Sequence, residues 1–311
     1  MKHNILSVAC MALLASASTS TWANNTWAAY PAWSRSSDSD GLVINKWFAG
    51  ALPMYGSGLS WRGVEWQQQR YEQNGQQLSG HGVNYTVQET DATTGLGYNY
   101  KIGINQGPHQ TLVNGDWSWN KAFSSQLQWG LFASRDWVES MAALQNSVHY
   151  DLVGGNIDYQ VHPRLTLIGS VAQTRFSDGQ NRQQQRARVV FDAWPEQGIT
   201  LQVSQKHQIG EKDVAVRRYF NPEQLDETMG FVGWRRRFEG WQWYARVGSG
   251  RQHVVNEAST PARLAELQIS SPVRGNSYFK LRAGESETRG INGPGYVYRY
   301  FDVQWIWRLD R

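Results

Sequence analysis

Histidine is the side chain in this sequence that is best suited to general base catalysis at neutral pH. A nucleophilic site also needs a hydroxyl or thiol within hydrogen-bond reach of that base. No serine stands two residues after His81, His149 or His253, so the pairing seen in acyl-cleaving barrel enzymes is missing. We therefore expect these histidines to occupy turn, rim or lumen positions rather than a catalytic site.

Closely spaced acids are the second group of residues that could take part in catalysis. Glu285 with Glu287, and Glu211 with Asp213, have the residue types that glycoside hydrolysis uses. Loop or lumen acids are the simpler interpretation of both pairs. The sequence has no His-Glu-x-x-His segment, no cysteine-based metal motif and no Gly-rich phosphate loop. We therefore predict no catalytic residue, no metal site and no cofactor, and we do not expect an enzyme.

The composition limits the class of protein. The 311 residues carry a net charge of +4, only 18% charged residues, 16 Trp, 14 Tyr and 30 Gly, and the mean hydropathy is −0.57. This mixture fits neither a disordered chain nor an ordinary soluble α/β enzyme. No basic run with interleaved aromatic residues predicts a nucleic-acid partner.

Residues 1–23 have the pattern of a cleaved secretory signal peptide. Lys2 provides a basic start, the segment 5–17 is mostly apolar, and Ala23 ends a plausible cleavage site. The single cysteine, Cys10, lies inside this segment, so the exported chain is expected to have no disulfide. No other stretch approaches the roughly 18 apolar residues of a transmembrane helix.

Along much of the sequence, apolar and polar residues alternate with a period of two. In 199–204, Ile, Leu and Val alternate with Thr, Gln and Ser, and 241–247 and 301–309 repeat the alternation with tryptophans on the apolar side. Such alternation is typical of a strand between two unlike environments. Turn signals such as Asn74-Gly75 and Gly293-Pro294-Gly295 separate about fifteen candidate strands.

These strands predict an all-β fold, a transmembrane antiparallel up-and-down barrel. Single-chain bacterial barrels have even strand numbers, so we expect about 16 strands, with 14 as the next choice. The barrel is predicted to span 41–311 as one domain. Residues 24–40 form a lead segment that could be a strand, a plug or a periplasmic arm.

A soluble β-sandwich is the main structural alternative. Its core would need large aliphatic side chains, whereas the apolar face here is rich in Trp, Tyr, Gly and Ala. Aromatic residues also gather at strand ends, as in Trp117-Ser118-Trp119, where membrane interfaces place them. We therefore predict localisation in the bacterial outer membrane, with outer-membrane lipid and the barrel assembly machinery as partners.

Several loop segments resemble those of a known family. They are Asp38-Ser39-Asp40-Gly41, His162-Pro163-Arg164-Leu165, Phe176-Ser177-Asp178-Gly179, Tyr219-Phe220-Asn221-Pro222-Glu223 and Gly293-Pro294-Gly295-Tyr296. With them the chain resembles the C-terminal porin barrels of bacterial exopolysaccharide export proteins, such as the poly-N-acetylglucosamine export porin and the cellulose secretion outer-membrane subunit. The resemblance implies a passive channel for a secreted polysaccharide.

The resemblance also implies a separate partner. Those proteins carry a tetratricopeptide superhelix before the barrel, and no helical repeat of about 34 residues fits this sequence. A periplasmic scaffold would then come from another protein. Two further functions stay open, a lipid- or glycan-modifying barrel enzyme and a structural or adhesive barrel that acts through its loops.

The polar side of the strands supplies the residues predicted to line a pore. These candidates are Asn99, Lys101, Asp116, Asp158, Arg186, Arg188, Asp192, Gln242, Tyr244, Arg246, Glu266, Lys280, Arg282, Asp302 and Arg308. The later strands look basic, which would favour an anionic substrate. The loop candidates Tyr219, Phe220, Asn221 and Pro222 form either an inward-folded constriction or a packed extracellular loop.

Overall fold

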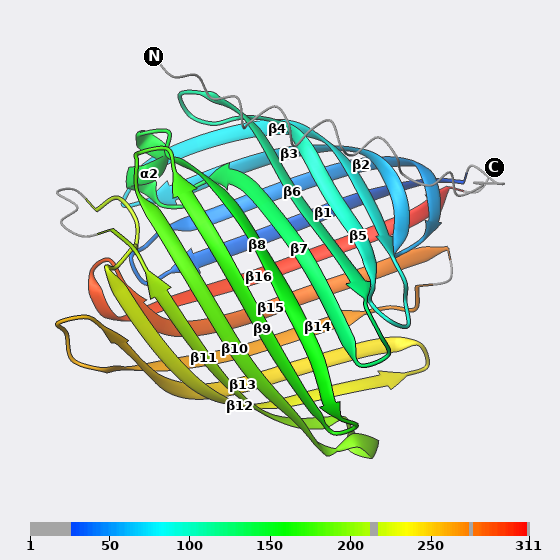
Figure 1. Ribbon diagram of the computed structural model, residues 1–311. Coiled ribbons are helices and arrows are strands. Elements are labelled where there is room, and N and C mark those ends of the chain that lie inside the picture. Colours follow the sequence, from blue (N-terminus) through cyan, green and yellow to red (C-terminus); the bar gives the residue numbers. More distant parts are fainter. Residues whose placement is uncertain (1–25, 212–216, 274–275, 310–311) are drawn as a thin grey trace.

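Sixteen antiparallel strands form a closed barrel in the computed structural model, and each strand pairs with its neighbours in the sequence (Figure 1). The structure describes residues 26–211, 217–273 and 276–309. The predicted fold class and strand number are therefore confirmed. The expected signal peptide, 1–23, lies outside the described residues.

The strands vary from ten to seventeen residues in length. In order they are β1 Trp27–Asp38, β2 Val43–Ser57, β3 Ser60–Gln73, β4 Gln76–Thr90, β5 Gly97–Gln106, β6 Thr111–Ala122, β7 Leu127–Trp137, β8 His149–His162, β9 Leu165–Phe176, β10 Asn181–Trp194, β11 Ile199–Ile209, β12 Gln224–Phe238, β13 Trp241–Val254, β14 Thr260–Ser270, β15 Ser277–Gly290 and β16 Gly293–Leu309. One α-helical turn, α2 Met141–Gln145, follows β7, and a 3₁₀ turn, η2 Pro195–Gln197, follows β10.

The barrel begins earlier than the sequence analysis predicted. The lead segment 24–40 supplies β1, which pairs with β2 on one side and with β16 on the other. Of the three alternatives for this segment, the strand is correct, because β2 and β16 would otherwise leave unpaired edges. The pairing with β16 steps from Ala29 to Ala32 and skips Tyr30 and Pro31. Proline has no backbone N–H to donate there.

Large apolar side chains cover the outer wall. Val171 is 61% exposed, Val203 56% and Val247 57%, and each alternates with a polar or small residue on the other face. None of the helices in the described ranges is long and apolar enough to cross a membrane. A closed sheet with an apolar exterior satisfies its own backbone hydrogen bonds and leaves no bare edge in lipid. The protein is therefore an integral barrel of the bacterial outer membrane.

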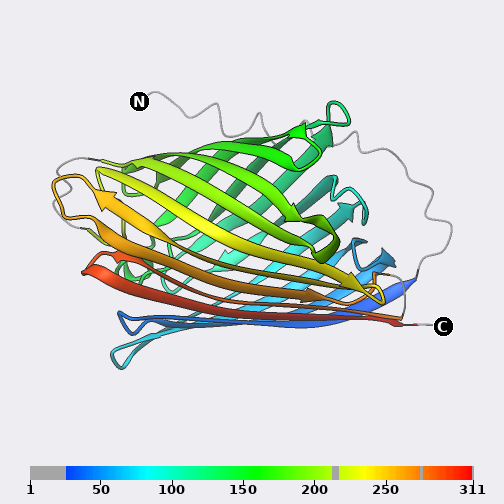
Figure 2. The same cartoon turned by 90° about the horizontal axis from the view of Figure 1, so that it is seen from below.

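The two ends of the barrel differ in their connections. At the end that holds Trp27 and Leu309, the strands are joined by short turns, whereas the other end carries two longer connections, 138–148 and 210–223 (Figure 2). Outer-membrane barrels have short periplasmic turns and longer extracellular loops. The end with the long connections is therefore the extracellular mouth.

Candidate functional site

The residues predicted to line a pore lie at the strand positions that alternate with the exposed apolar ones. Arg186 and Arg188, for example, are interleaved with Val189 and Phe191, whose side chains are 41% and 43% exposed on the outer wall. The same alternation places the other candidates on the lumen face. They are Asn99 and Lys101 on β5, Asp116 on β6, Asp158 on β8, Asp192 on β10, Gln242, Tyr244 and Arg246 on β13, Glu266 on β14, Lys280 and Arg282 on β15, and Asp302 and Arg308 on β16. Their contact with a substrate stays a prediction.

Some of these lumen residues are tied to the wall by polar contacts. Arg246 Nη2 lies 2.9 Å from Glu266 Oε1, directly across from it on β14. Asp302 accepts a hydrogen bond of 2.6 Å from Ser34, across the β1–β16 seam. Asn99 donates to the hydroxyl of Ser118 at 2.8 Å. These contacts fix side chains that would otherwise move freely in the lumen.

Glu65 on β3 is a lumen residue that the sequence analysis missed. Glu65 is 7% exposed, and its carboxylate accepts hydrogen bonds from Tyr30 at 2.5 Å, Lys101 at 2.9 Å and Asn84 at 3.2 Å. Three donors on three different strands therefore converge on one buried acid. A buried charge needs such partners because desolvation would otherwise be costly.

A glycine makes this convergence possible. Tyr30, Gly50 and Glu65 lie in one row across β1, β2 and β3. The Tyr30 ring lies over Gly50 so closely that a Cβ on this residue would be 2.0 Å from a ring carbon. No local sequence pattern marks Glu65, since Tyr30 and Lys101 each lie two strands away from it.

A ladder of amide side chains continues along the same wall. Gln69 donates to Asn105 at 2.8 Å, and Asn84 donates to Gln67 at 3.2 Å. All four side chains are buried among the inward positions of β3, β4 and β5. Asn84 Oδ1 and Asn105 Nδ2 have no protein partner within the described ranges. These amides are neutral hydrogen-bonding groups on the wall that also carries the Glu65–Lys101 ion pair.

The connection that contains α2 folds into the extracellular mouth. Met141 and Leu144 are buried against Ile44, Tyr71 and Leu112, which face inward from the barrel wall. Ser140 caps the helical turn by accepting from the Ala143 backbone N–H at 3.2 Å. Ser140 followed by the apolar segment 141–144 is a helix-start signal that the sequence analysis did not use.

The predicted loop Tyr219 to Pro222 is packed, and it also lies inside the mouth. The Tyr219 ring lies 4.4 Å from that of Phe176, and its hydroxyl donates to Asp178 at 2.8 Å. Burial and the neighbouring Asp178 carboxylate raise the pKa of the Tyr219 hydroxyl well above its usual value.

Asn221 fixes the rest of this loop. Its side chain accepts from Arg182 at 3.0 Å and donates to Gln180 at 3.1 Å, while Pro222 is fully buried. The two long connections also meet each other, because the Ser140 hydroxyl donates to the Arg218 carbonyl at 2.5 Å. The elements at the mouth are therefore joined into one packed unit.

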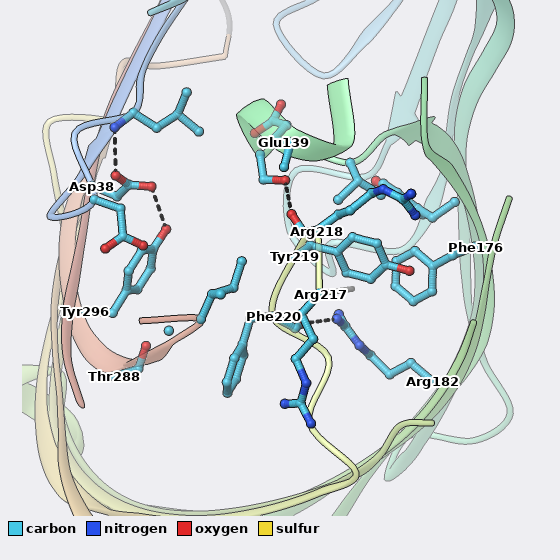
Figure 3. A pocket seen from close by; sticks show the side chains of 18 of the residues that line it. Asp38, Glu139, Phe176, Arg182, Arg217, Arg218, Tyr219, Phe220, Thr288 and Tyr296 are labelled. Atoms are coloured by element: carbon cyan, nitrogen blue, oxygen red, sulfur yellow. Dashed lines mark hydrogen bonds between the residues drawn. The ribbon is translucent and has the colours of Figure 1, made fainter. Parts of the chain in front are cut away.

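A cavity of about 900 Å³ remains between this packed unit and the opposite wall. Figure 3 shows Asp38, Thr288 and Tyr296 on one side and Phe176, Arg182 and Tyr219 on the other, with Arg217 and Phe220 between them. Acidic and basic groups line it from strands and from connections between them. The acids are Asp38, Asp40, Asp116, Asp136, Glu139 and Glu227, and the bases are Lys46, Arg182, Lys206, Arg217, Arg218 and Arg289.

A polar lumen, an apolar exterior and loops that narrow the mouth define the architecture of an outer-membrane porin-like barrel. Known structures with this fold support that class. A protein described as a bacterial polysaccharide outer membrane secretin superposes with a TM-score of 0.65 at 13% identity, over 92% of this chain and 99% of its own. At this identity the similarity shows the fold alone.

Two porins of Pseudomonas aeruginosa superpose more loosely. OccK7 (OpdD) gives a TM-score of 0.41 at 13% identity, over 92% of this chain and 98% of its own. OccK5 (OpdH) gives 0.45 at 9% identity, over 92% and 98%. No family model matches the sequence, and no curated protein sequence matches it.

Proposed function

We propose that the protein is a passive channel through which a polysaccharide is secreted across the outer membrane. The observation that carries this proposal is the lumen, which is lined along its length by amides, tyrosines and charged groups and is narrowed at the mouth by packed loops. Amide and phenol groups exchange hydrogen bonds with sugar hydroxyls without holding one orientation. The fold match to a polysaccharide secretin supports the same substrate class.

Conductance across planar lipid bilayers tests the channel. Purified protein should form pores whose current falls when a soluble oligosaccharide enters the lumen. A purified, heat-modifiable barrel that never conducts would contradict the proposal. A deletion strain should retain polysaccharide in the periplasm and regain secretion when the gene is restored.

A lipid-modifying enzyme is the second candidate, and one contact favours it. On the outer wall of the extracellular half, His207 Nδ1 lies 2.6 Å from Asp226 Oδ1, which is the arrangement of a base and its orienting acid. Within the described ranges, no serine or threonine hydroxyl makes a hydrogen bond with His207. Envelope lipids from cells that express His207→Ala should therefore match those of the wild type. An altered lipid profile would instead support the enzymatic function.

A further inference from the structure

Cations gather on one half of the lumen wall. Between β10 and β15 the inward positions carry Arg182, Arg186, Arg188, Lys206, Arg235, Arg237, Arg246, Lys280 and Arg282, and the inward acids of the same strands are Asp192, Glu227 and Glu266. The other half, from β16 through β9, carries the inward acids Asp38, Glu65, Asp116, Asp136, Asp158 and Asp302 with the bases Lys46, Lys101 and Arg308. We call the first group the basic wall.

The basic wall runs along the lumen rather than forming a single ring. Arg182, Arg186 and Arg188 all lie on β10, and six residues of strand span about 20 Å. Arg235 lies near the periplasmic end of β12, and Arg182 contributes to the cavity at the extracellular mouth. Positive groups are therefore available from one end of the lumen to the other.

Aromatic rings hold several of these guanidinium groups in place. Arg246 lies 4.7 Å from the Phe231 ring centroid, Arg235 lies 5.5 Å from that of Tyr244, and Arg282 lies 5.6 Å from that of Tyr300. The Tyr300 ring lies over Gly284 on the neighbouring strand, which keeps it flat against the wall. Stacking orients a guanidinium without neutralising its charge.

The key cations keep their charge available to the lumen. Arg186 and Arg282 are exposed, and within the described ranges neither forms an ion pair with an acid. Arg188 lies near Arg186 and Arg246, and Glu266, which pairs with Arg246, offsets part of the positive charge there. By contrast, the wall of β3 to β5 presents mainly amides, as described above.

We propose that an acidic polysaccharide, one whose sugar rings carry carboxylates, moves through the lumen along the basic wall. This inference rests on the proposed channel function and names its substrate class. Spaced, stacked guanidinium groups along the lumen would bind successive carboxylates weakly and pass them on. Tyr244 and Tyr300 would meet the sugar rings beside them.

Ion selectivity of the wild-type pore gives the first test. In a planar bilayer with a KCl gradient, the reversal potential should show that chloride is more permeant than potassium. Oligogalacturonate added to the bath should block the current at lower concentration than neutral maltohexaose, and at lower concentration than cationic chitosan oligomers. A conducting pore that prefers potassium, or that chitosan blocks best, would overturn the acidic substrate and leave the channel intact. A barrel without conductance would instead contradict the channel itself.

A double variant then assigns the effect to the basic wall. Arg186→Gln with Arg282→Gln should lower the chloride-to-potassium permeability ratio by roughly twofold or more, because two charges near the conduction path are lost. Block by oligogalacturonate should weaken in parallel. The matched control, Arg175→Gln with Arg251→Gln, removes the same charge from exposed outer-wall positions and should leave both readouts unchanged. An equal change in the two double variants would refute the role of the basic wall in substrate passage.

Discussion

Glu65 is a buried acid of the lumen wall with three side-chain donors, and its environment makes it a structural residue. Tyr30, Asn84 and Lys101 each donate to it, and they come from β1, β4 and β5. Asn84 lies directly opposite Glu65 on the neighbouring strand, whereas Tyr30 and Lys101 each lie two strands away, so Glu65 links strands beyond its immediate neighbours. An acid held in this way does not bind a moving substrate, because its acceptor oxygens are already occupied.

Glu65→Ala is expected to lower the free energy of unfolding by about 3 kcal/mol, since Lys101 and Tyr30 would lose their buried partner. Urea unfolding of the barrel in liposomes, followed by tryptophan fluorescence, measures the change. Glu72→Ala is the matched control, because Glu72 pairs with Arg70 and both side chains are more than 40% exposed. We expect less than about 0.5 kcal/mol there. Equal losses in the two variants would show that Glu65 has no special role.

Gly50→Ala tests the close approach of the Tyr30 ring. The new Cβ would collide with the ring, and the Tyr30 hydroxyl would move away from Glu65. Overpacking of this kind costs about 2 kcal/mol. Gly230→Ala, a strand glycine whose nearest neighbour to the new Cβ is 4.0 Å away, should be close to neutral. Gly50→Ala with unaltered unfolding in urea would mean that the ring can relocate freely.

At the scale of elements, the two long connections act as one constriction. Asn221→Ala removes the side chain that bonds to Arg182 and Gln180 and should release the Tyr219 loop from β10. We expect larger and noisier single-channel conductance than in the wild type. Gln110→Ala, at an exposed position of the β5–β6 turn at the same mouth and outside the cavity lining, should leave the conductance unchanged. A quiet, wild-type current in Asn221→Ala would show that the loop is held by Pro222 and Phe176 alone.

Sequence periodicity predicted most strands because lipid and lumen impose opposite demands on successive residues. It failed to include β1, where Pro31 and small residues such as Ala28, Ala29 and Ser36 blur the alternation. It also failed to find α2, a single turn whose position depends on contacts with the barrel wall. Glu65 was missed for a related reason, since Tyr30 and Lys101 each lie two strands away and reach it only when β1 to β5 are paired.

For the whole molecule, the apolar belt on the outer wall determines membrane insertion. Val189 lies in this belt between Leu167 and Val203 on the neighbouring strands. Val189→Arg should cost about 2–4 kcal/mol near the bilayer midplane and reduce the heat-modifiable protein in outer-membrane fractions. Gln183→Arg, on the same face of β10 but beyond the belt, should cost about 0–1 kcal/mol. Comparable loss of both variants would place the belt elsewhere on the wall.

The seam between β1 and β16 has a consequence for how the cylinder fails. Its ladder skips Tyr30 and Pro31, and its first and last strands are held by no covalent turn between them. Under an applied pulling force, the barrel should begin to unfold at the β1–β16 pairing. Unfolding should then proceed one β-hairpin at a time. Ala32 and Gln304 face each other across the seam. In the double variant Ala32→Cys with Gln304→Cys, oxidation would join β1 and β16 by a disulfide. Such a locked barrel should resist mechanical extraction at forces that unravel the wild type.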